Sequence, residues 1–470
     1  MTEIVAFAGL LALLICLLDW RVGVLLTITL GFVADPIRKL IPGQPVILTV
    51  AVAVFAAVTL LGLLQQRDRP PLRQLLTRYG VIARPMQWFF LWLVFAALLT
   101  ILNFGSPILA GIGLIAYLAP LPGLLLAYYY SVSPPQMYRL FKTYLLLCVT
   151  MELGVLLAGF GLAWPVLQRI GPEKYVAQIG QAFSGFFRAP EVAAWHAATA
   201  VCLLLVFATV SKKPMSRVSA AILITMLLVV GLLTGRRKML AQIVLFVGVY
   251  GASLVYMRRG AQKLLAVGLI VAVIAGFAVS YLLSQTDAEQ GPAFDAYFGR
   301  GVSVFASTPQ RVEELGLGSL YWATRSAGIL GRGAGVASQG SQHFGGGSQL
   351  VGGSGEGGLG KIVLELGIPG LILFSWIGLS VAVTLWRMIQ HLSRLAPSSA
   401  LLAAGLVALL AAQVPTFVVA SQIYGDPFVL TMVGALFGAI LAIGSWPVPD
   451  QYVYSPVPAD KRRAPQHDRH

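Results

Sequence analysis

A short run of cations separates two apolar segments of the sequence, in the stretch LLTGRRKML. A planar guanidinium binds a phosphate through two parallel hydrogen bonds, so Arg236, Arg237 and Lys238 beside a helix end predict a site for phosphate or diphosphate. Two other interpretations stay open: the cations contact lipid headgroups, or they pair with Glu313 or Glu314. These cations are unusual because the span count places them on the non-cytoplasmic side, where basic residues are disfavoured. A different number of membrane spans would place them in the cytoplasm and remove this anomaly.

A second group of polar residues lies in the stretch GFFRAPEVAAWHAATA. Arg188 stands just before a proline that favours the first turn of a helix, and Glu191 and Trp195 then share one helix face. We expect Arg188 to join the anion site, with Glu191 at its edge and His196 as a secondary candidate. The alternatives are a local ion pair between Arg188 and Glu191 and a packing role for His196, and for His196 the packing role is favoured.

A long polar connection carries the third group. Its first part, 309–330, is predicted to be an amphipathic helix with Arg311 and Arg325, and a glycine-rich run follows. Glycines let a backbone approach a ligand and turn its amides toward an anion, although a flexible lid without contacts is the alternative. Glu356 has no helical partner, so it is a candidate for catalysis or substrate binding, and His343 is a reserve candidate.

The other polar residues within or beside apolar runs favour structural roles. Lys361 and Glu365 are four residues apart, which is typical of a pair on one helix face. Glu152 and Gln413 lie inside apolar runs, where an ionisable group is a functional candidate by default, but they rank below the arginines. The cysteines lack the CxxC spacing of a metal cluster and indicate buried small side chains: Cys16, Cys148 and Cys202.

These groups must be positioned by helices in a membrane. The 470 residues are 57% hydrophobic and 11% charged, with a mean hydropathy of +0.81. Soluble domains carry about 25% charged residues, so a soluble enzyme and a disordered chain are both excluded. Apolar runs of about 20 residues are long enough to cross a bilayer as helices. We predict an all-α polytopic membrane protein with about 12–14 transmembrane helices, and the working set has these runs: 4–18, 21–34, 45–64, 86–104, 107–131, 140–161, 191–210, 218–234, 239–257, 264–284, 361–386, 398–422 and 427–446.

Basic residues in the short loops predict the orientation. The span count places five clusters on one side: Arg67 to Arg84, Lys212 to Arg217, Arg258 to Lys263, Arg387 to Arg394 and Lys461 to Arg463. Cytoplasmic loops carry an excess of lysine and arginine, so this side is predicted to be the cytoplasm. The same bias explains much of the net charge of +15 without a nucleic-acid partner. The three candidate groups then lie on the opposite side, where the cations of the TGRRK loop oppose the rule.

Four parts of the chain follow from this pattern. Residues 1–284 form the N-terminal helices, with an outer loop near 162–190, and begin with a retained helix. Whether the first two runs are one broken helix or two helices is open at Asp19-Trp20-Arg21. The three remaining parts are a large outer loop with a helical start and a glycine-rich end, the C-terminal helices, and a proline-rich cytoplasmic tail predicted to be disordered: 285–360, 361–446 and 447–470.

Taken together and in order, three features resemble the O-antigen ligase and O-antigen polymerase superfamily of bacterial envelope enzymes. They are GFFRAPEVAAWH after an outer loop, the LLTGRRKML hairpin, and a large outer loop with Arg311, GILGRGAG and LELGIPGLILF. The resemblance covers roughly residues 150–375. In this family a histidine usually stands about nine residues before the Glu of the ELG segment, which here is Glu365. This chain has Glu356 there, so it is similar to a variant branch with a carboxylate in place of the histidine.

The resemblance implies a membrane glycosyltransferase of the GT-C type that acts on the periplasmic face of the bacterial inner membrane. Its donor would be a polyprenyl-diphosphate-linked oligosaccharide and its acceptor a hydroxyl group of another glycan, with no metal or other cofactor. Other polysaccharide-export proteins are possible partners. Polymerases and ligases differ only in the acceptor, which no residue names, and the departure at Glu356 favours a polymerase.

The predicted roles follow from the chemistry. Glu356 would be the general base and Arg311 its catalytic partner at the diphosphate. The remaining cations would bind the substrate diphosphate in place of a metal: Arg188, Arg236, Arg237, Lys238 and Arg325. A direct displacement would invert the anomeric centre. The competing classes are a lipid-linked glycan flippase or other transporter, with cations along a path open to both sides, and a scaffold. Cations on one side favour the enzyme.

Overall fold

The computed structural model describes the helical part of the chain, over residues 2–67, 70–168, 182–211, 213–236, 238–269, 271–272, 312–338, 357–419 and 421–447. Within these ranges the chain is helical and contains no strand, so the predicted all-α polytopic membrane protein is confirmed. Ten described helices are long and apolar enough to cross a membrane, and two shorter apolar helices accompany them. These twelve coincide with twelve of the thirteen predicted runs. The run at 264–284 lies mostly outside the described residues.

The helices follow one another with short connections. Their bounds are α1 (Thr2–Leu18), α2 (Trp20–Leu40), α3 (Ile47–Gln65), α4 (Leu72–Arg78), α5 (Gly80–Phe104), α6 (Pro107–Leu118), α7 (Pro120–Tyr130), α8 (Pro134–Gly159), η1 (Pro165–Leu167), α9 (Pro190–Val210), α10 (Pro214–Leu233), α11 (Lys238–Tyr256), η2 (Val312–Gly318), α14 (Ser319–Ala327), α17 (Gly358–Leu395), α18 (Pro397–Val419), η3 (Ser421–Gly425) and α19 (Pro427–Ile443). α1 and α2 are separate helices. Asp19 ends the first and caps the second, because its Oδ1 accepts hydrogen bonds from the amides of Arg21 and Val22.

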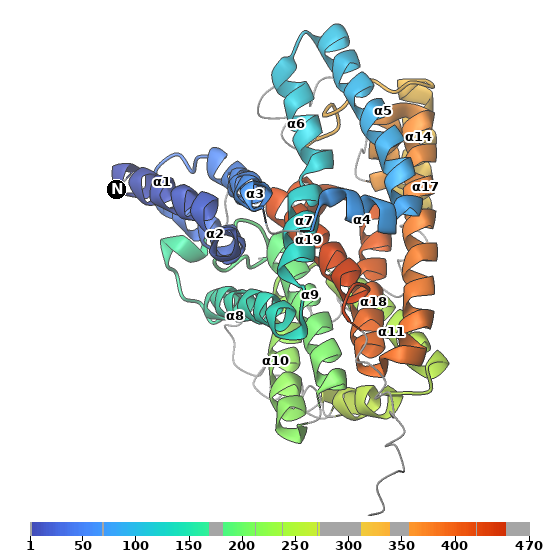
Figure 1. Ribbon diagram of the computed structural model, residues 1–470. Coiled ribbons are helices and arrows are strands. Elements are labelled where there is room, and N and C mark those ends of the chain that lie inside the picture. The colour runs from blue at the N-terminus through green and yellow to red at the C-terminus, as the bar shows by residue number, and fades with distance from the viewer. Residues whose placement is uncertain are drawn as a thin grey trace, which may run out of the picture.

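α9 lies at the centre of the bundle (Figure 1). Almost every one of its residues is buried, and it packs against α8, α10, α11 and α18. Much of α9 is alanine. In lipid the hydrophobic effect does not drive helices together, so their association depends on close packing, which small residues such as alanine allow. The outer helices expose leucine, phenylalanine and tryptophan side chains, as a surface in contact with lipid requires.

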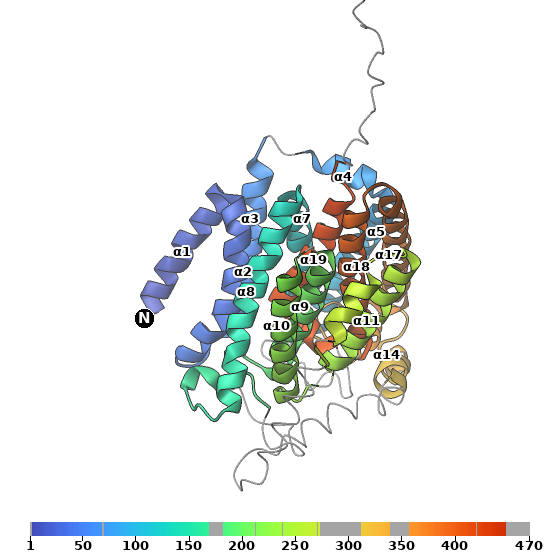
Figure 2. The same cartoon turned by 90° about the horizontal axis from the view of Figure 1, so that it is seen from below.

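The two ends of the bundle carry different loops. Figure 2 shows α4 at one end and α14 at the other. We call the first the basic end, because it holds α4 and the described parts of the basic connections: 211–217, 256–263 and 387–396. The second, the site end, holds the described residues with candidate chemistry: 35–46, 182–191, 234–236, 238, 312–338, 416–419 and 421–427. The sequence therefore predicted correctly which described loops share an end.

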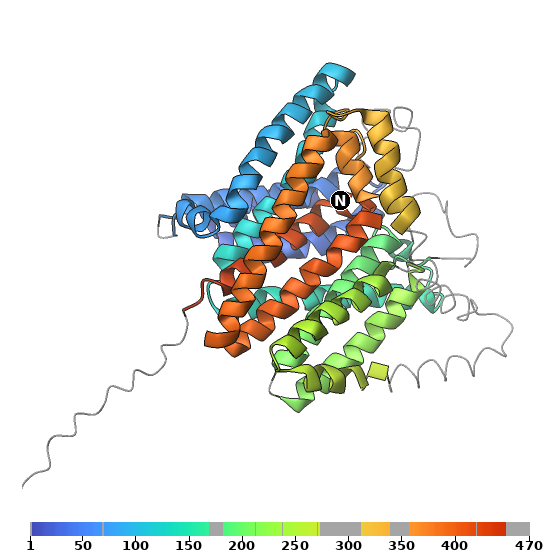
Figure 3. The same cartoon turned by 90° about the vertical axis from the view of Figure 1, so that its right-hand side faces the viewer.

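α17 is two helices joined at a kink, and its first part carries the LELG motif. Gly367 adopts φ +68°, and Pro369 follows. A kink leaves backbone groups without helical partners, and each must be paired elsewhere when buried. Here the amides of Arg332 and Gly333 pair with the carbonyls of Leu364 and Glu365. The first part of α17 lies beside α14 (Figure 3).

The described glycines of the large loop hold it against helices. Gly333 adopts φ +117°, and a Cβ there would lie 2.4 Å from Thr100 Oγ1 on α5. Gly335 adopts φ +93°, and a Cβ there would lie 2.2 Å from the Leu109 carbonyl on α6. These glycines allow a close approach between loop and helix, and the segment 331–338 is not the contact-free lid that was the alternative prediction.

Glu365 ties three elements together at the site end. Its Oε2 accepts a hydrogen bond from the Tyr117 hydroxyl at 2.6 Å, and its Oε1 accepts one from the Ala337 amide at 2.9 Å. The predicted pair with Lys361 is wrong: no ion pair joins these two described residues. Lys361 lies instead 6.0 Å from the centre of the Tyr117 ring. The carboxylate is held by a phenol and an amide from other elements, which spacing along one helix cannot predict.

Candidate functional site

Arg188 is held between two carboxylates at the site end. It lies in the turn before α9, with its NH2 atom 2.5 Å from Asp426 Oδ2 and its NH1 atom 3.6 Å from Asp35 Oδ1. Its backbone amide also donates to Asp35 Oδ2 at 3.0 Å. The predicted alternative, an ion pair with Glu191, is wrong. Arg188 joins three elements that are distant in sequence: α2, the start of α9 and the start of α19.

This arrangement fixes the charge of Arg188. Burial disfavours the charged guanidinium, but Asp426 and Asp35 outweigh it and raise the pKa of Arg188 above its ordinary value. Asp426 also caps α19, because its Oδ1 accepts from the amides of Phe428 and Val429. Lys39 completes the turn by donating to the Gly185 carbonyl at 2.6 Å. Removing Arg188 would leave two buried carboxylates without their ion-pair partner, which is costly.

A cavity of about 190 Å³ opens beside Arg188. Its polar lining includes Arg38, Arg188, Thr49 and Ser338, while Asp35 and Asp426 do not line it. Its other walls are mostly apolar and come from α3, α6 and the start of α19: Val46, Val50, Ile112, Ile115, Ala116, Ala119, Gly425, Pro427 and Leu430. We call this space the arginine cavity. Ile115 on α6 is 41% exposed, and Figure 1 shows α6 at the edge of the bundle, so the cavity lies near the outer surface of the helices.

Arg38 is the cation in this cavity that has no acidic partner within ion-pair distance among the described residues. Its Nε donates to the Gln44 carbonyl at 2.9 Å, and its NH1 atom donates to Thr49 Oγ1 at 3.2 Å. A guanidinium has five N–H donors in a rigid fork, so these bonds orient Arg38 and leave donors for a ligand.

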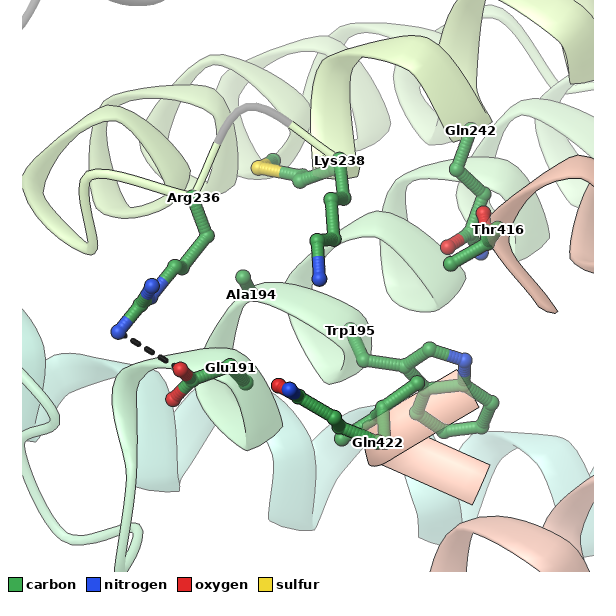
Figure 4. Close-up of a pocket in the computed structure, with 10 residues that line it drawn as sticks. Glu191, Ala194, Trp195, Arg236, Lys238, Gln242, Thr416 and Gln422 are labelled. Atoms are coloured by element: carbon green, nitrogen blue, oxygen red, sulfur yellow. Dashed lines mark ion pairs between the residues drawn. The ribbon is translucent and has the colours of Figure 1, made fainter. Parts of the chain in front are cut away.

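Arg236 lies in a second pocket, of about 30 Å³ (Figure 4). Its NH2 atom lies 2.6 Å from Glu191 Oε1, and Lys238 reaches toward Glu191 and Gln422. Trp195 and Gln242 form the inner wall. We call this space the lysine pocket; the remaining lining residues are Ala194, Met239, Thr416 and Ile423.

The arginines that the sequence assigned to one anion site thus line two spaces. The segment between α18 and α19 contributes to both: Gln422 and Ile423 line the lysine pocket, whereas Gly425 and Pro427 line the arginine cavity. Glu191 belongs to the lysine pocket, one turn of α9 after Arg188. Of the predicted cations, Arg188, Arg236 and Lys238 lie at one end of the bundle, but they line two different spaces.

His196 is a packing residue, as the favoured interpretation held. Its side chain is fully buried and its Nδ1 is 2.8 Å from the Tyr144 hydroxyl. The ring stacks on Phe187 at 5.3 Å with an interplanar angle of 16°, and it lies 4.9 Å from Phe32 and 5.1 Å from Phe428. It lines neither of the two spaces.

The other predicted residues divide into two classes. Arg325 is described: it is exposed on α14, its guanidinium lies 4.4 Å from the centre of the Tyr321 ring, and it lines neither space. Four others lie outside the described residues, so their roles stay predictions: Arg237, Arg311, His343 and Glu356.

Sequence reasoning missed Arg38, Lys39 and the two aspartates that hold Arg188. The signal for the cations was present, because Arg38 and Lys39 end a helix on the side where basic residues are disfavoured. The same criterion that selected the TGRRK loop would have found them. Asp35 and Asp426 gave no such signal, because their role depends on contacts between distant segments.

The described ranges contain no group of three or more histidine, cysteine, aspartate or glutamate side chains placed to hold a metal ion. The sequence matches no model of a known protein family and no curated protein. The resemblance to the O-antigen superfamily therefore rests on the three motifs and their order.

Proposed function

We propose that this protein is a membrane glycosyltransferase that uses a polyprenyl-diphosphate-linked glycan as donor and a glycan hydroxyl as acceptor. The arginine cavity is the observation that carries the proposal. It combines guanidinium groups with apolar walls near the outer surface of the helices. A ligand that fits such a space has an anionic head and a hydrocarbon chain, which is the chemistry of a lipid diphosphate.

The position of the cavity supports the same function. It lies at the site end, opposite the basic loops, and the positive-inside rule assigns the basic end to the cytoplasm. The cavity would then face the periplasm of the inner membrane, where a lipid-linked glycan is used after export. Within the described residues the cavity, Arg188 and the Arg236–Glu191 pair all lie at this one end, whereas a transporter needs charged groups along a path reached from both sides.

The proposed reaction needs groups that bind the diphosphate and a base that removes the acceptor proton. Arg38 would contact the diphosphate, and the two carboxylates would keep the guanidinium of Arg188 fixed at the wall of the cavity, where its remaining donors can face the ligand. As the acceptor oxygen attacks the anomeric carbon, the bond from that carbon to the diphosphate oxygen breaks and polyprenyl diphosphate leaves with the electron pair. The proton of the acceptor hydroxyl passes to a base, for which Glu356 remains the proposed residue. A single displacement of this kind inverts the anomeric centre.

A reconstitution experiment tests this function. The full chain in lipid nanodiscs is given a polyprenyl-diphosphate oligosaccharide, and products are separated by glycan length. We expect longer glycans with inverted linkages and release of polyprenyl diphosphate. Glu356→Gln should abolish transfer, because a general base contributes about 10²–10⁴-fold. Glu313→Gln is the matched control, since Glu313 is an exposed carboxylate at the same end.

The acceptor supplied in the assay separates the finer possibilities. Elongation of the donor glycan indicates a polymerase, the activity we favour, whereas transfer only to a lipid A core indicates a ligase. In sealed vesicles, movement of the lipid-linked glycan across the membrane without a new glycosidic bond would contradict the enzyme and support the flippase.

A further inference from the structure

We infer that a pocket at the basic end of the bundle binds the headgroup of a zwitterionic phospholipid. The pocket has a volume of about 510 Å³ and is lined by residues from the α1–α2 junction, the end of α3 and the end of α7. We call it the junction pocket, because Asp19, Trp20 and Arg21 at that junction contribute to its lining. Its ligand is independent of the proposed glycosyl transfer, which is assigned to the site end.

The junction pocket lies at the level of the membrane–water interface. α2 begins at Trp20, α3 ends at Gln65 and α7 ends at Tyr130, and Figure 2 shows these helix ends at the same end of the bundle as α4. Tryptophan and tyrosine are enriched at membrane interfaces, and here Trp20 and Tyr129 line the pocket. Leu18 also lines it and is 74% exposed on α1, at the edge of the bundle. A ligand can therefore place a polar head in the pocket and a hydrocarbon chain along α1.

The lining carries one cation and one anion that are not paired with each other. Arg21 and Asp19 both line the pocket and are both exposed, and neither forms an ion pair with a described residue. Asp19 Oδ1 accepts hydrogen bonds from the amides of Arg21 and Val22, whereas its Oδ2 has no donor among the described residues. Each of the two charges is therefore accessible to an opposite charge on a ligand.

The aromatic wall of the pocket is fixed before a ligand binds. Trp20 is buried, its Nε1 donates a hydrogen bond to Gln66 Oε1 at 2.7 Å, and its ring meets that of Tyr130 edge to face at 6.3 Å. The guanidinium of Arg21 lies 5.5 Å from the centre of the Trp20 ring, where the ring face attracts a cation. These contacts orient Arg21 in advance, which lowers the entropy cost of binding.

The two opposite charges select a zwitterionic headgroup. A phosphate accepts charge-assisted hydrogen bonds from a guanidinium, and a primary ammonium donates them to a carboxylate. Phosphatidylethanolamine carries both groups in one headgroup, so Arg21 can bind its phosphate and Asp19 its ammonium. An anionic lipid such as phosphatidylglycerol offers only the phosphate and brings a negative charge close to Asp19. The volume of about 510 Å³ lies within the roughly 300–1,000 Å³ of pockets that bind small molecules.

Lipid-binding measurements on the full chain test this inference. The protein is stripped of lipid in a mild detergent and titrated with phosphatidylethanolamine, phosphatidylglycerol or free phosphoethanolamine, and native mass spectrometry gives the affinities. We expect phosphatidylethanolamine to bind about fivefold more tightly than phosphatidylglycerol, the effect of one solvent-accessible charge pair. Arg21→Gln should weaken binding of both lipids about fivefold. Asp19→Asn should weaken only phosphatidylethanolamine and so remove the preference. Asparagine caps a helix as well as aspartate does, so α2 should keep its start.

The matched control is Arg84→Gln, the same change at an exposed arginine of the basic end that does not line the pocket. It should leave both lipid affinities unchanged. Equal affinity of the unmodified protein for the two lipids would overturn the inference, as would unchanged phosphatidylethanolamine binding in Arg21→Gln and Asp19→Asn. Binding of free phosphoethanolamine as tight as that of the lipid would contradict a lipid ligand. The assay contains no glycan donor, so its result does not depend on the proposed glycosyl transfer.

Discussion

The arginine cavity and the lysine pocket lie at the same end of one helical bundle but differ in what holds their cations. In the cavity, Arg188 is neutralised by two acids behind the wall and Arg38 faces an apolar space. In the pocket, Arg236 and its acid partner Glu191 both line the space itself. The first arrangement suits a charged head attached to a hydrocarbon chain, and the second suits a polar group with both donors and acceptors. Arginines thus suit different ligands depending on the position of their acidic partners, which lie behind the wall in the cavity and line the space in the pocket.

The largest expected effect is a difference in folding stability between a variant of Arg188 and a variant of Arg236. Arg188→Met would leave Asp35 and Asp426 buried without a cation, which costs about 3–5 kcal/mol when one partner of a buried pair is removed. Arg236→Met would leave only the partly exposed Glu191, so the expected loss is about 0–1 kcal/mol, as for an exposed pair. Thermal unfolding of both variants in the same detergent measures the difference. Asp35→Asn with Asp426→Asn should restore part of the stability of Arg188→Met, and equal losses in the two single variants would contradict the comparison.

A glycine substitution tests the contact between the described part of the large loop and α5. Gly333→Ala places a Cβ against Thr100 at a positive φ, and we expect a loss of about 3 kcal/mol from backbone strain and overpacking. Gly328 also has a positive φ, but a Cβ there meets nothing within 4 Å. Gly328→Ala is therefore the matched control, with an expected loss of about 1 kcal/mol. Chemical denaturation of the two variants would contradict the account if their midpoints were the same.

Removing the ligand-facing cation should affect transfer more than folding. Arg38→Gln keeps a polar side chain in the cavity but loses the charge, and we expect the transfer rate to fall about 100-fold, as for one preorganised donor to a developing negative charge. Arg84→Gln, an exposed change at the basic end, serves as the control. Near-normal transfer by Arg38→Gln would show that the cavity is not the diphosphate site.

The smallest effect is expected at His196, which lies on α9 and lines neither space. His196→Phe would remove the partner of the Tyr144 hydroxyl and should cost about 1 kcal/mol. Transfer per folded molecule should stay unchanged, which kinetic measurements after removal of aggregated protein can establish. A selective loss of rate in a folded variant would return His196 to the list of catalytic candidates.

The described part of the fold was largely predictable because its causes are local. The length of an apolar run decides whether a helix can span the bilayer, and the basic loops decide which ends face the same way. Asp19 decides the break between α1 and α2 through its own capping hydrogen bonds. Each of these causes can be recognised from the residue types of one helix or of the loop beside it.

The site was predictable only in part, because its decisive contacts join distant segments. Arg188 and Arg236 were selected by residue type and side of the membrane, but Asp35 and Asp426 became the partners of Arg188 only because the fold brings the end of α2 and the start of α19 to the turn before α9. The same limit explains Glu365, whose partner Tyr117 lies 248 residues away. Gln242 is a single amide in an apolar run, and nothing in its neighbours along the chain distinguishes it.

Equilibrium binding of polyprenyl diphosphate is the most direct test of the central claim, that the arginine cavity holds a lipid diphosphate. The full chain in nanodiscs would be titrated with polyprenyl diphosphate and, separately, with the uncharged polyprenol. The account predicts saturable binding of the diphosphate alone, weakened at least about tenfold by Arg38→Gln and unchanged by Arg84→Gln. Equal binding of the two lipids, or equal affinity in Arg38→Gln and the unmodified protein, would contradict it.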